Sequence, residues 1–345
     1  IWILFFKHKK PIGVWIMAYT DIDKPSDYFN TKLYTGTGTS GSPFSLTGVG
    51  FAPNWVWIKR RGGAAVGHRI FDTIRGATKY IDSSANSAET TNTSTLTAFG
   101  SDGFTLQNDG SVNDGSEPFV SWNWKETATA GFDIVSYTGS GSAKTVSHSL
   151  SAVPKMIIVK NRSSDRNFCV FHTSLGATKF LRLNLTNAEG TSGGRWNDTA
   201  PTSSVFTVGD DAEVNSNGDN YIAYCFADVK GYSKVSGSYT GNGNADGTFV
   251  YTGFKPAFIL AKDADSSDNW IIHDTTRNPS NPVGAYLRPN LSSAEGTFSH
   301  YDILSNGFKN LYAGGSLNGS GKNIIYMAFA ENPFVTSTGV PATAR

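Results

Sequence analysis

Cysteine and methionine are scarce in this chain of 345 residues, with two and three copies, and histidine occurs six times. Cys169 and Cys225 both lie in apolar runs that predict strands, so we expect two buried free thiols. A disulfide is the alternative if those strands are neighbours. Metal centres are usually built from clustered cysteine, histidine and acidic residues. Because no such cluster is evident, the sequence predicts neither a metal nor a cofactor.

Charge is also sparse, at 17% of residues with a formal net charge of +1. Proteins that bind nucleic acid or an anionic membrane carry a strongly basic face or tail. We therefore expect neither nucleic acid nor a membrane surface among the partners.

Residues 1–16 differ from the rest of the chain. They begin with six apolar residues, Ile1–Phe6, followed by the basic stretch Lys7-His-Lys-Lys10. Six residues cannot span a bilayer, and the order of apolar and basic residues is the reverse of a secretory signal. We expect an extension upstream of a natural start at Met17, produced by a misassigned start codon. The alternative is a short apolar plug that docks on a partner.

The abundant residues indicate an all-β protein. The chain contains 37 Gly, 22 Phe, 14 Tyr and 8 Trp, and its short apolar runs are separated by spacers rich in Gly, Ser, Thr and Asn. That pattern is typical of antiparallel β-sandwiches. No amphipathic helix longer than about two turns is evident.

One stretch is written three times, as Phe51–Lys59, Ala152–Lys160 and Phe254–Lys262. In each copy a proline (53, 154 or 256) precedes an apolar run, and a lysine lies six positions after that proline. A short run rich in branched and aromatic residues predicts a strand buried on both faces, with the proline outside its hydrogen-bond ladder.

The copies define three repeats, at 33–129, 130–233 and 234–335, each large enough to have its own core. We predict three tandem antiparallel β-sandwich modules of jelly-roll or lectin-like type, joined by short linkers into a fairly stiff string. Residues 1–32 are predicted to be an N-terminal extension and attachment arm, and residues 336–345 a flexible tail.

An acidic residue and an arginine three positions apart recur as Asp72–Arg75 and Asp274–Arg277, whereas the second copy has Thr173–Gly176. Such a pair could grip a polar ligand, or it could be an ion pair that ties a turn to the sandwich. The structural interpretation is favoured because one repeat lacks the pair.

Two tryptophans, Trp196 and Trp270, are the candidates for partial exposure. An exposed tryptophan in a sandwich loop can stack on a sugar ring, although core packing is the commoner fate. The lysines that end the repeated strands, Lys59, Lys160 and Lys262, are expected to snorkel outward or to bond the polar stretch that follows.

Carboxylates offer two further candidates. Glu89, Glu189 and Glu295 occupy equivalent positions, but glycoside hydrolysis needs two carboxylates facing one sugar, and loop hydrogen bonding is the favoured interpretation. Asp263, Asp265 and Asp268 could bind calcium, yet they lack the remaining ligands of an EF-hand loop. With no nucleophile-elbow, phosphate-loop or dinucleotide pattern, we predict a non-enzymatic protein.

The stretches Met17–Gly36 and Gly50–Arg61, with Asp72-Thr-Ile-Arg-Gly and Ser101–Phe104, resemble a family of repeat-bearing structural proteins of tailed, often marine, bacteriophages. The resemblance covers about residues 17–335 and implies a component of the virion surface of tail-fibre or appendage type. We expect other virion proteins as partners, a homo-oligomer, and contact with a host-surface glycan. A capsid-decorating or filament-forming protein and a carbohydrate-binding module are the alternatives.

Overall fold

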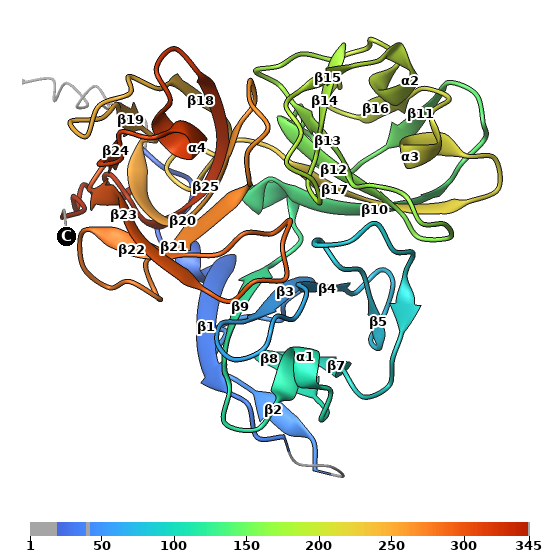
Figure 1. The fold of residues 1–345 in the computed structure, drawn as a ribbon, viewed down its shortest axis with the longest axis horizontal. Helices are drawn as coiled ribbons and strands as arrows, with labels where there is room; N and C mark the ends of the chain where they lie inside the picture. The colour runs from blue at the N-terminus through green and yellow to red at the C-terminus, as the bar shows by residue number, and fades with distance from the viewer. Residues whose placement is uncertain (1–18, 39–41, 344–345) are drawn as a thin grey trace, which may run out of the picture.

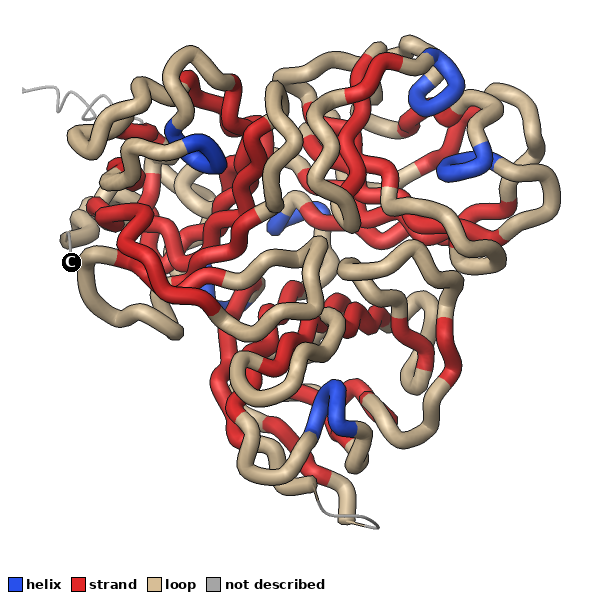
Figure 2. Tube along the Cα trace, viewed as in Figure 1, coloured by secondary structure: helices blue, strands red, loops and turns tan. Residues whose placement is uncertain are grey.

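The computed structural model describes residues 19–38 and 42–343, and antiparallel strands make up most of its regular structure (Figures 1 and 2). In this part of the chain helix is confined to four short α-helices and two 3-10 turns. The all-β prediction with antiparallel sandwich sheets is confirmed.

The strands fall into three units. Unit 1 contains η1 (Pro25–Asp27), β1 (Phe29–Thr35), β2 (Phe44–Leu46), β3 (Trp55–Arg60), β4 (Arg69–Asp72), β5 (Lys79–Tyr80), β6 (Thr90–Thr91), β7 (Leu96–Gly100), β8 (Gly103–Leu106), α1 (Gly110–Asn113) and β9 (Pro118–Trp124). Unit 2 contains η2 (Ala128–Ala130), β10 (Phe132–Thr138), β11 (Lys144–Ser147), β12 (Met156–Asn161), β13 (Cys169–His172), β14 (Lys179–Arg182), β15 (Gly190–Thr191), α2 (Gly193–Trp196), β16 (Val205–Val208), α3 (Ala212–Asn215) and β17 (Asn220–Phe226). Unit 3 contains β18 (Ser233–Thr240), β19 (Phe249–Tyr251), β20 (Phe254–Asp263), β21 (Ile271–Asp274), β22 (Val283–Tyr286), β23 (Gly296–Leu304), β24 (Gly307–Asn310), α4 (Gly315–Asn318) and β25 (Asn323–Pro333).

Each unit pairs its strands in the same order. The inner sheets run β1-β9-β3-β4, β10-β17-β12-β13 and β18-β25-β20-β21, and the second of these continues into β14 and β15. An outer sheet covers each inner sheet: β2-β8-β7, β11-β16 or β19-β24-β23-β22. The first and last strands of a unit are therefore neighbours, so each repeat closes on itself.

The repeated strand is buried on both faces, as predicted. Along β3, Trp55 and Trp57 belong to one hydrophobic cluster, whereas Val56 and Ile58 belong to another that lies between the two sheets of unit 1. Successive side chains of a strand point to opposite faces, which explains this alternation. β12 and β20 divide their side chains in the same way.

The cluster that contains Trp55 and Trp57 is shared by all three units. At its centre the rings of Phe29 and Phe329 lie 5.3 Å apart, those of Trp55 and Tyr224 4.8 Å apart, and those of Phe226 and Phe329 6.1 Å apart. Every pair of units is thus joined by aromatic contacts, and Figure 1 shows three lobes meeting at a common centre. Full burial of one large apolar side chain contributes about 1.5–3 kcal/mol, so each unit depends on the others to cover its inner sheet. The expectation of a string of separate modules is wrong.

The predicted arm and tail boundaries also need correction. The boundary at residue 33 falls inside β1, and Ile22 and Phe29 lie in the shared cluster. Residues 19–32 are therefore part of the folded body, while the predicted upstream extension, residues 1–16, lies outside the described residues. At the other end, Asp23 accepts hydrogen bonds from the backbone and side chain of Ser337. Up to residue 343 the predicted flexible tail forms a hydrogen-bonded turn against the body.

Cys169 and Cys225 are buried free thiols, as predicted. Burial raises the pKa of both, which keeps them protonated and unreactive near neutral pH. Within the described ranges, no helix is long and apolar enough to cross a membrane.

Candidate functional site

The Asp72–Arg75 pair lies at the end of β4 and is completely buried. Arg75 donates from its backbone N (2.8 Å) and its Nε (2.5 Å) to the Asp72 carboxylate, and from Nη2 to the carbonyl of Ile70 (2.8 Å). Both side chains have 0% exposure. The pair therefore locks the turn after β4 and presents no surface to a ligand.

Asp274 and Arg277 repeat this arrangement after β21, with the same 2.8 and 2.5 Å contacts and 0% exposure. The predicted ligand-gripping role is wrong for all four residues, and the structural interpretation describes them.

Each of these aspartates also accepts a hydrogen bond from a neighbouring unit. Tyr224 of unit 2 donates its hydroxyl to Asp72 Oδ2 at 2.7 Å. Trp122 of unit 1 donates its indole N–H to Asp274 Oδ2 at 3.0 Å. The buried ion pairs therefore stabilise contacts between units as well as turns within them.

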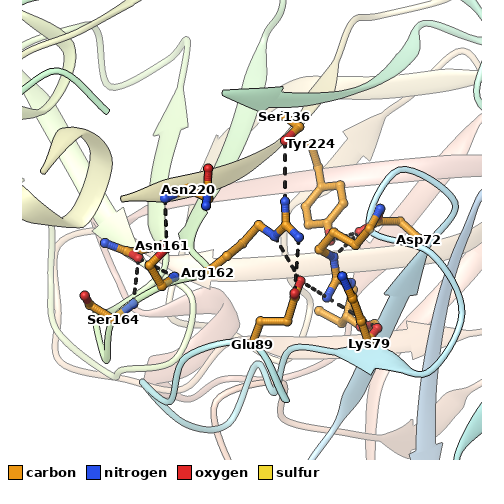
Figure 3. Close-up of polar contacts among 12 residues, drawn as sticks. Asp72, Lys79, Glu89, Ser136, Asn161, Arg162, Ser164, Asn220 and Tyr224 are labelled. Carbon is orange, nitrogen blue, oxygen red and sulfur yellow. Dashed lines mark hydrogen bonds and ion pairs between the residues drawn. The ribbon is translucent and has the colours of Figure 1, made fainter. Parts of the chain in front are cut away.

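Two of the three glutamates predicted to bond loops, Glu89 and Glu295, form charged clamps across the same boundaries. Arg162 of unit 2 binds Glu89 through Nε (2.9 Å) and Nη2 (3.1 Å), as Figure 3 shows beside Asp72 and Tyr224. Arg61 of unit 1 binds Glu295 in the same bidentate way at 2.9 and 2.8 Å. Bidentate arginine–carboxylate pairs are among the stronger polar contacts in proteins.

The electrostatics of Glu295 follow from this geometry. Burial by itself would raise the pKa of Glu295, but the hydrogen bonds from Arg61 and the charge of Arg277 Nη1, 3.0 Å away, lower it. Glu295 therefore stays ionised as the centre of a two-arginine clamp. Glu89 and Glu295 belong to different interfaces, so they do not form the paired carboxylates of a glycosidase.

Backbone hydrogen bonds close the units into a cycle. Glu89 N donates to Arg162 O at 3.0 Å, joining units 1 and 2. Glu189 N donates to Ala264 O at 2.7 Å and Glu295 N to Arg61 O at 2.9 Å, which joins unit 2 to unit 3 and unit 3 to unit 1. Equivalent atoms make all three contacts, so the units surround an approximate threefold axis. We call the contacts the 1–2, 2–3 and 3–1 interfaces.

The repeated lysines point into these interfaces. Lys59 Nζ donates to the carbonyls of Val66 (2.7 Å) and, across the 3–1 interface, Ser292 (3.1 Å). Lys160 Nζ donates to Arg166 O (2.6 Å) and, across the 1–2 interface, to Asn86 O (3.0 Å).

Lys262 Nζ bonds carbonyls of its own turn, including that of Ser266 at 2.8 Å. The predicted bonding to the following polar stretch is confirmed. The snorkelling alternative is wrong because all three lysines are 0% exposed. Burial lowers the pKa of each to about 8.

The 2–3 interface lacks the arginine clamp. The strand register aligns His172 and Leu175, not Thr173 and Gly176, with the Asp–Arg pair. Ala264 replaces the clamping arginine, and Met327 replaces the donors Trp122 and Tyr224. Glu189 instead binds Lys179 of its own unit at 2.5 Å. Burial lowers the pKa of His172 to about 4, so this histidine is neutral near pH 7.

Both candidate tryptophans are buried, at 1% exposure. Trp196 lies edge-on to Phe171, with ring centroids 5.8 Å apart, and Trp270 donates its N–H to the carbonyl of Arg182 at 2.9 Å across the 2–3 interface. The expectation that they are partly exposed is wrong, and neither offers a ring face to a sugar.

The predicted calcium alternative is not supported by the contacts of its aspartates. Asp263, Asp265 and Asp268 accept backbone hydrogen bonds from Asp265, Asn323 and Asn269 respectively, at 2.8–2.9 Å. Among residues 19–38 and 42–343 no group of three or more His, Cys, Asp or Glu side chains is placed to hold a metal ion. These aspartates serve a turn.

A family model, described as Domain of unknown function (DUF7483), matches residues 24–333. The chain belongs to this family. A single family model runs from the start of η1 to the end of β25, in agreement with one body built from three units. No curated protein matches the chain.

The two arginines that bind the glutamates at the 1–2 and 3–1 interfaces of this DUF7483 chain were not predicted from its sequence. Arg61 and Arg162 each follow the repeated lysine by two positions, and the third copy has Ala264 there. The sequence does carry a signal for these arginines, because the Asp–Arg pair and the interface arginine are lost together. Unit 2 lacks the pair, and the 2–3 interface that follows it has Ala264 in place of the arginine. Reading it required knowledge of which repeats touch.

Proposed function

We propose that this protein is a non-enzymatic structural component of a bacteriophage virion, of appendage or tail-fibre type, that presents its outer sheets and loops to the host surface. The observation that carries the proposal is the closed threefold arrangement of sandwiches. The inner sheets and the charged clamps are used to join the units. The outer sheets and their loops are left for contact with other molecules.

The state of the candidate catalytic groups supports a non-enzymatic role. Glu89 and Glu295 are each held by arginines, Asp72 and Asp274 are buried in ion pairs, and both thiols are buried. Most of the groups whose pKa values are shifted lie in the core and the interfaces. These shifts follow from burial and serve assembly of the fold.

One observation favours a second candidate, a capsid-decorating protein. A chain with an approximate threefold axis fits a threefold position on a particle with one copy, because its three units present equivalent surfaces there. Either role places the protein on the virion surface with other virion proteins as partners. The predicted homo-oligomer belongs to the same proposal.

Immunogold labelling of particles made by a phage that carries this gene tests the proposal. Label on the tail or its appendages is the expected result, together with binding of the purified, fluorescently labelled protein to host cells. Label spread over the head in fixed copy number would favour the decorating role. Particles that carry no label would contradict both.

A further inference from the structure

Exposed aromatic side chains are concentrated in unit 3. Among the described residues, the aromatic side chains in the most exposed class are Phe249 (46%), Tyr251 (56%) and Phe298 (47%), all on the outer sheet of this unit. Exposed aromatic surface of this kind commonly marks an interaction site.

The other two units provide internal controls for this feature. The pairing of β19 with β24 matches β2 with β8 and β11 with β16, which makes Tyr251 equivalent to Thr47 and Ser147. All three positions are exposed. Unit 3 alone has exchanged a small hydroxyl side chain for an aromatic ring, and the fold does not require the exchange.

Tyr251 forms one wall of an open pocket of about 470 Å³ where unit 2 leads into unit 3. The pocket is also lined by Tyr19, Asp228, Lys230 and Lys234. The hydroxyls of Tyr19 and Tyr251 are 2.9 Å apart, and Tyr19 also donates to the carbonyl of Gly253 at 3.0 Å. A pocket of roughly 300–1,000 Å³ is the usual size for a small-molecule site.

The charge in this pocket is positive. Asp228 is fully engaged, because it accepts hydrogen bonds from the backbone of Val235 and Ser236 and pairs with Lys234 at 3.0 Å. Lys230 is exposed and lies with its Nζ 5.1 Å from the centre of the Tyr19 ring. No carboxylate of the described residues pairs with it, so its charge is available to a ligand.

We infer that this pocket binds an acidic saccharide. The apolar C–H face of a pyranose ring would stack on Tyr251, because aromatic faces carry partial negative charge and attract C–H groups. Its carboxylate or sulfate would lie near the ammonium of Lys230, and its hydroxyls would meet the two tyrosine hydroxyls. The inference rests on the proposed function and names the ligand class of host adhesion.

The test uses the full chain on an oligosaccharide array with carboxylated, sulfated and neutral sugars, followed by titration calorimetry with the best binder. Tyr251→Ser replaces the ring with the equivalent residue of unit 2, Ser147, and Lys230→Gln removes the positive charge of the lysine. Ser147→Ala and Thr47→Ala are the matched controls. We expect binding to anionic sugars that weakens by about tenfold or more in each pocket variant and is unchanged in the controls. Comparison of the affinities for carboxylated and sulfated sugars would identify the anionic group that the pocket prefers.

Unfolding midpoints of the pocket variants equal to that of the native chain would show that the loss is local. Three results would overturn the inference: binding of neutral sugars only, binding of anionic sugars that is unchanged in both pocket variants, or no binding to any sugar. A virion protein captured through Tyr251 in place of a sugar would also overturn it. Host-cell adhesion that persists in both pocket variants would leave the proposed function standing while the pocket inference fails.

Discussion

The 1–2 and 2–3 interfaces join equivalent strands of different units, but their side-chain contacts differ. At the 1–2 interface, Glu89 is held by Arg162, and the buried Asp72–Arg75 pair receives the Tyr224 hydroxyl. At the 2–3 interface the backbone hydrogen bond from Glu189 to Ala264 is kept, while the arginines disappear. Both interfaces share the aromatic core and the backbone hydrogen bond. The space beside these contacts is filled by charged residues at the 1–2 interface and by neutral residues at the 2–3 interface.

The replacements at the 2–3 interface come as a set. His172 takes the place of the aspartate, Leu175 that of its arginine, and Met327 that of the neighbouring donor. Removing one partner of a buried ion pair leaves an uncompensated charge, whereas replacing the whole group with neutral residues can be nearly neutral for stability. The chain contains both solutions, which makes the comparison testable by mutation.

The largest effect is expected for Arg75→Leu, which imports the equivalent residue of unit 2 and leaves Asp72 buried without its cation. The free energy of unfolding should fall by about 3–5 kcal/mol. Urea denaturation followed by tryptophan fluorescence measures it. A loss below about 1 kcal/mol would contradict the view that this pair stabilises the interface.

The triple variant Asp72→His, Arg75→Leu, Tyr224→Met gives the buried group of the 1–2 interface the residues of the 2–3 interface. Because the unpaired charge is gone, most of the stability lost in Arg75→Leu should return in the same denaturation experiment. A triple variant less stable than the single variant would show that the two chemistries are not interchangeable.

Acid should weaken the 2–3 interface through His172. Its folded pKa of about 4 lies below the ordinary value of 6.5, so the unfolded chain binds the extra proton between these values. The contribution of the neutral His172 ring to the free energy of unfolding is complete above pH 6.5. It is lost as the pH falls toward 4, on the order of 3 kcal/mol in total.

His172→Gln should flatten the dependence of unfolding free energy on pH in that window by about one proton, measured by urea denaturation at a series of pH values. Ser174→Ala is the control, since it removes the hydroxyl beside His172 and leaves the titrating ring. An unchanged slope in His172→Gln would contradict the assignment.

A smaller effect is expected for Arg162→Met, which removes the bidentate bond to Glu89 but leaves Arg75 at 3.5 Å from that carboxylate. The expected loss is about 2 kcal/mol. Lys179→Met is the matched change at the 2–3 interface, and its pair with Glu189 is more exposed, so the loss should stay below about 1 kcal/mol. Equal losses in the two variants would remove the distinction between the interfaces.

Much of the fold was accessible from the sequence because the repeated strand carries apolar residues on both faces. The five-residue run from Trp55 to Lys59 reveals that both faces are buried, and the proline before it precedes the strand in units 1 and 2. In unit 3 the prediction is wrong, because Pro256 lies inside β20 at an irregularity of the strand pairing. The pattern does not reveal what covers each face. Trp55 packs against Tyr224, in another repeat, and no local periodicity encodes that contact.

The candidate site shows the same limit. The Asp–Arg spacing correctly indicated a structural ion pair, because a residue three positions away can close a turn locally. The exposure of Trp270 was predicted wrongly because this residue lies at the 2–3 interface, where its indole N–H donates to the carbonyl of Arg182. Tyr251 escaped notice because its significance appears only beside its equivalents, Thr47 and Ser147.

Small-angle X-ray scattering of the purified chain tests the central claim, that the three units close around one shared core. A compact body of this length should have a radius of gyration of about 20–25 Å and a pair-distance distribution with a single symmetric peak. A string of three separate sandwiches would give a radius above about 30 Å and a distribution with a long tail. That second result would contradict the closed arrangement.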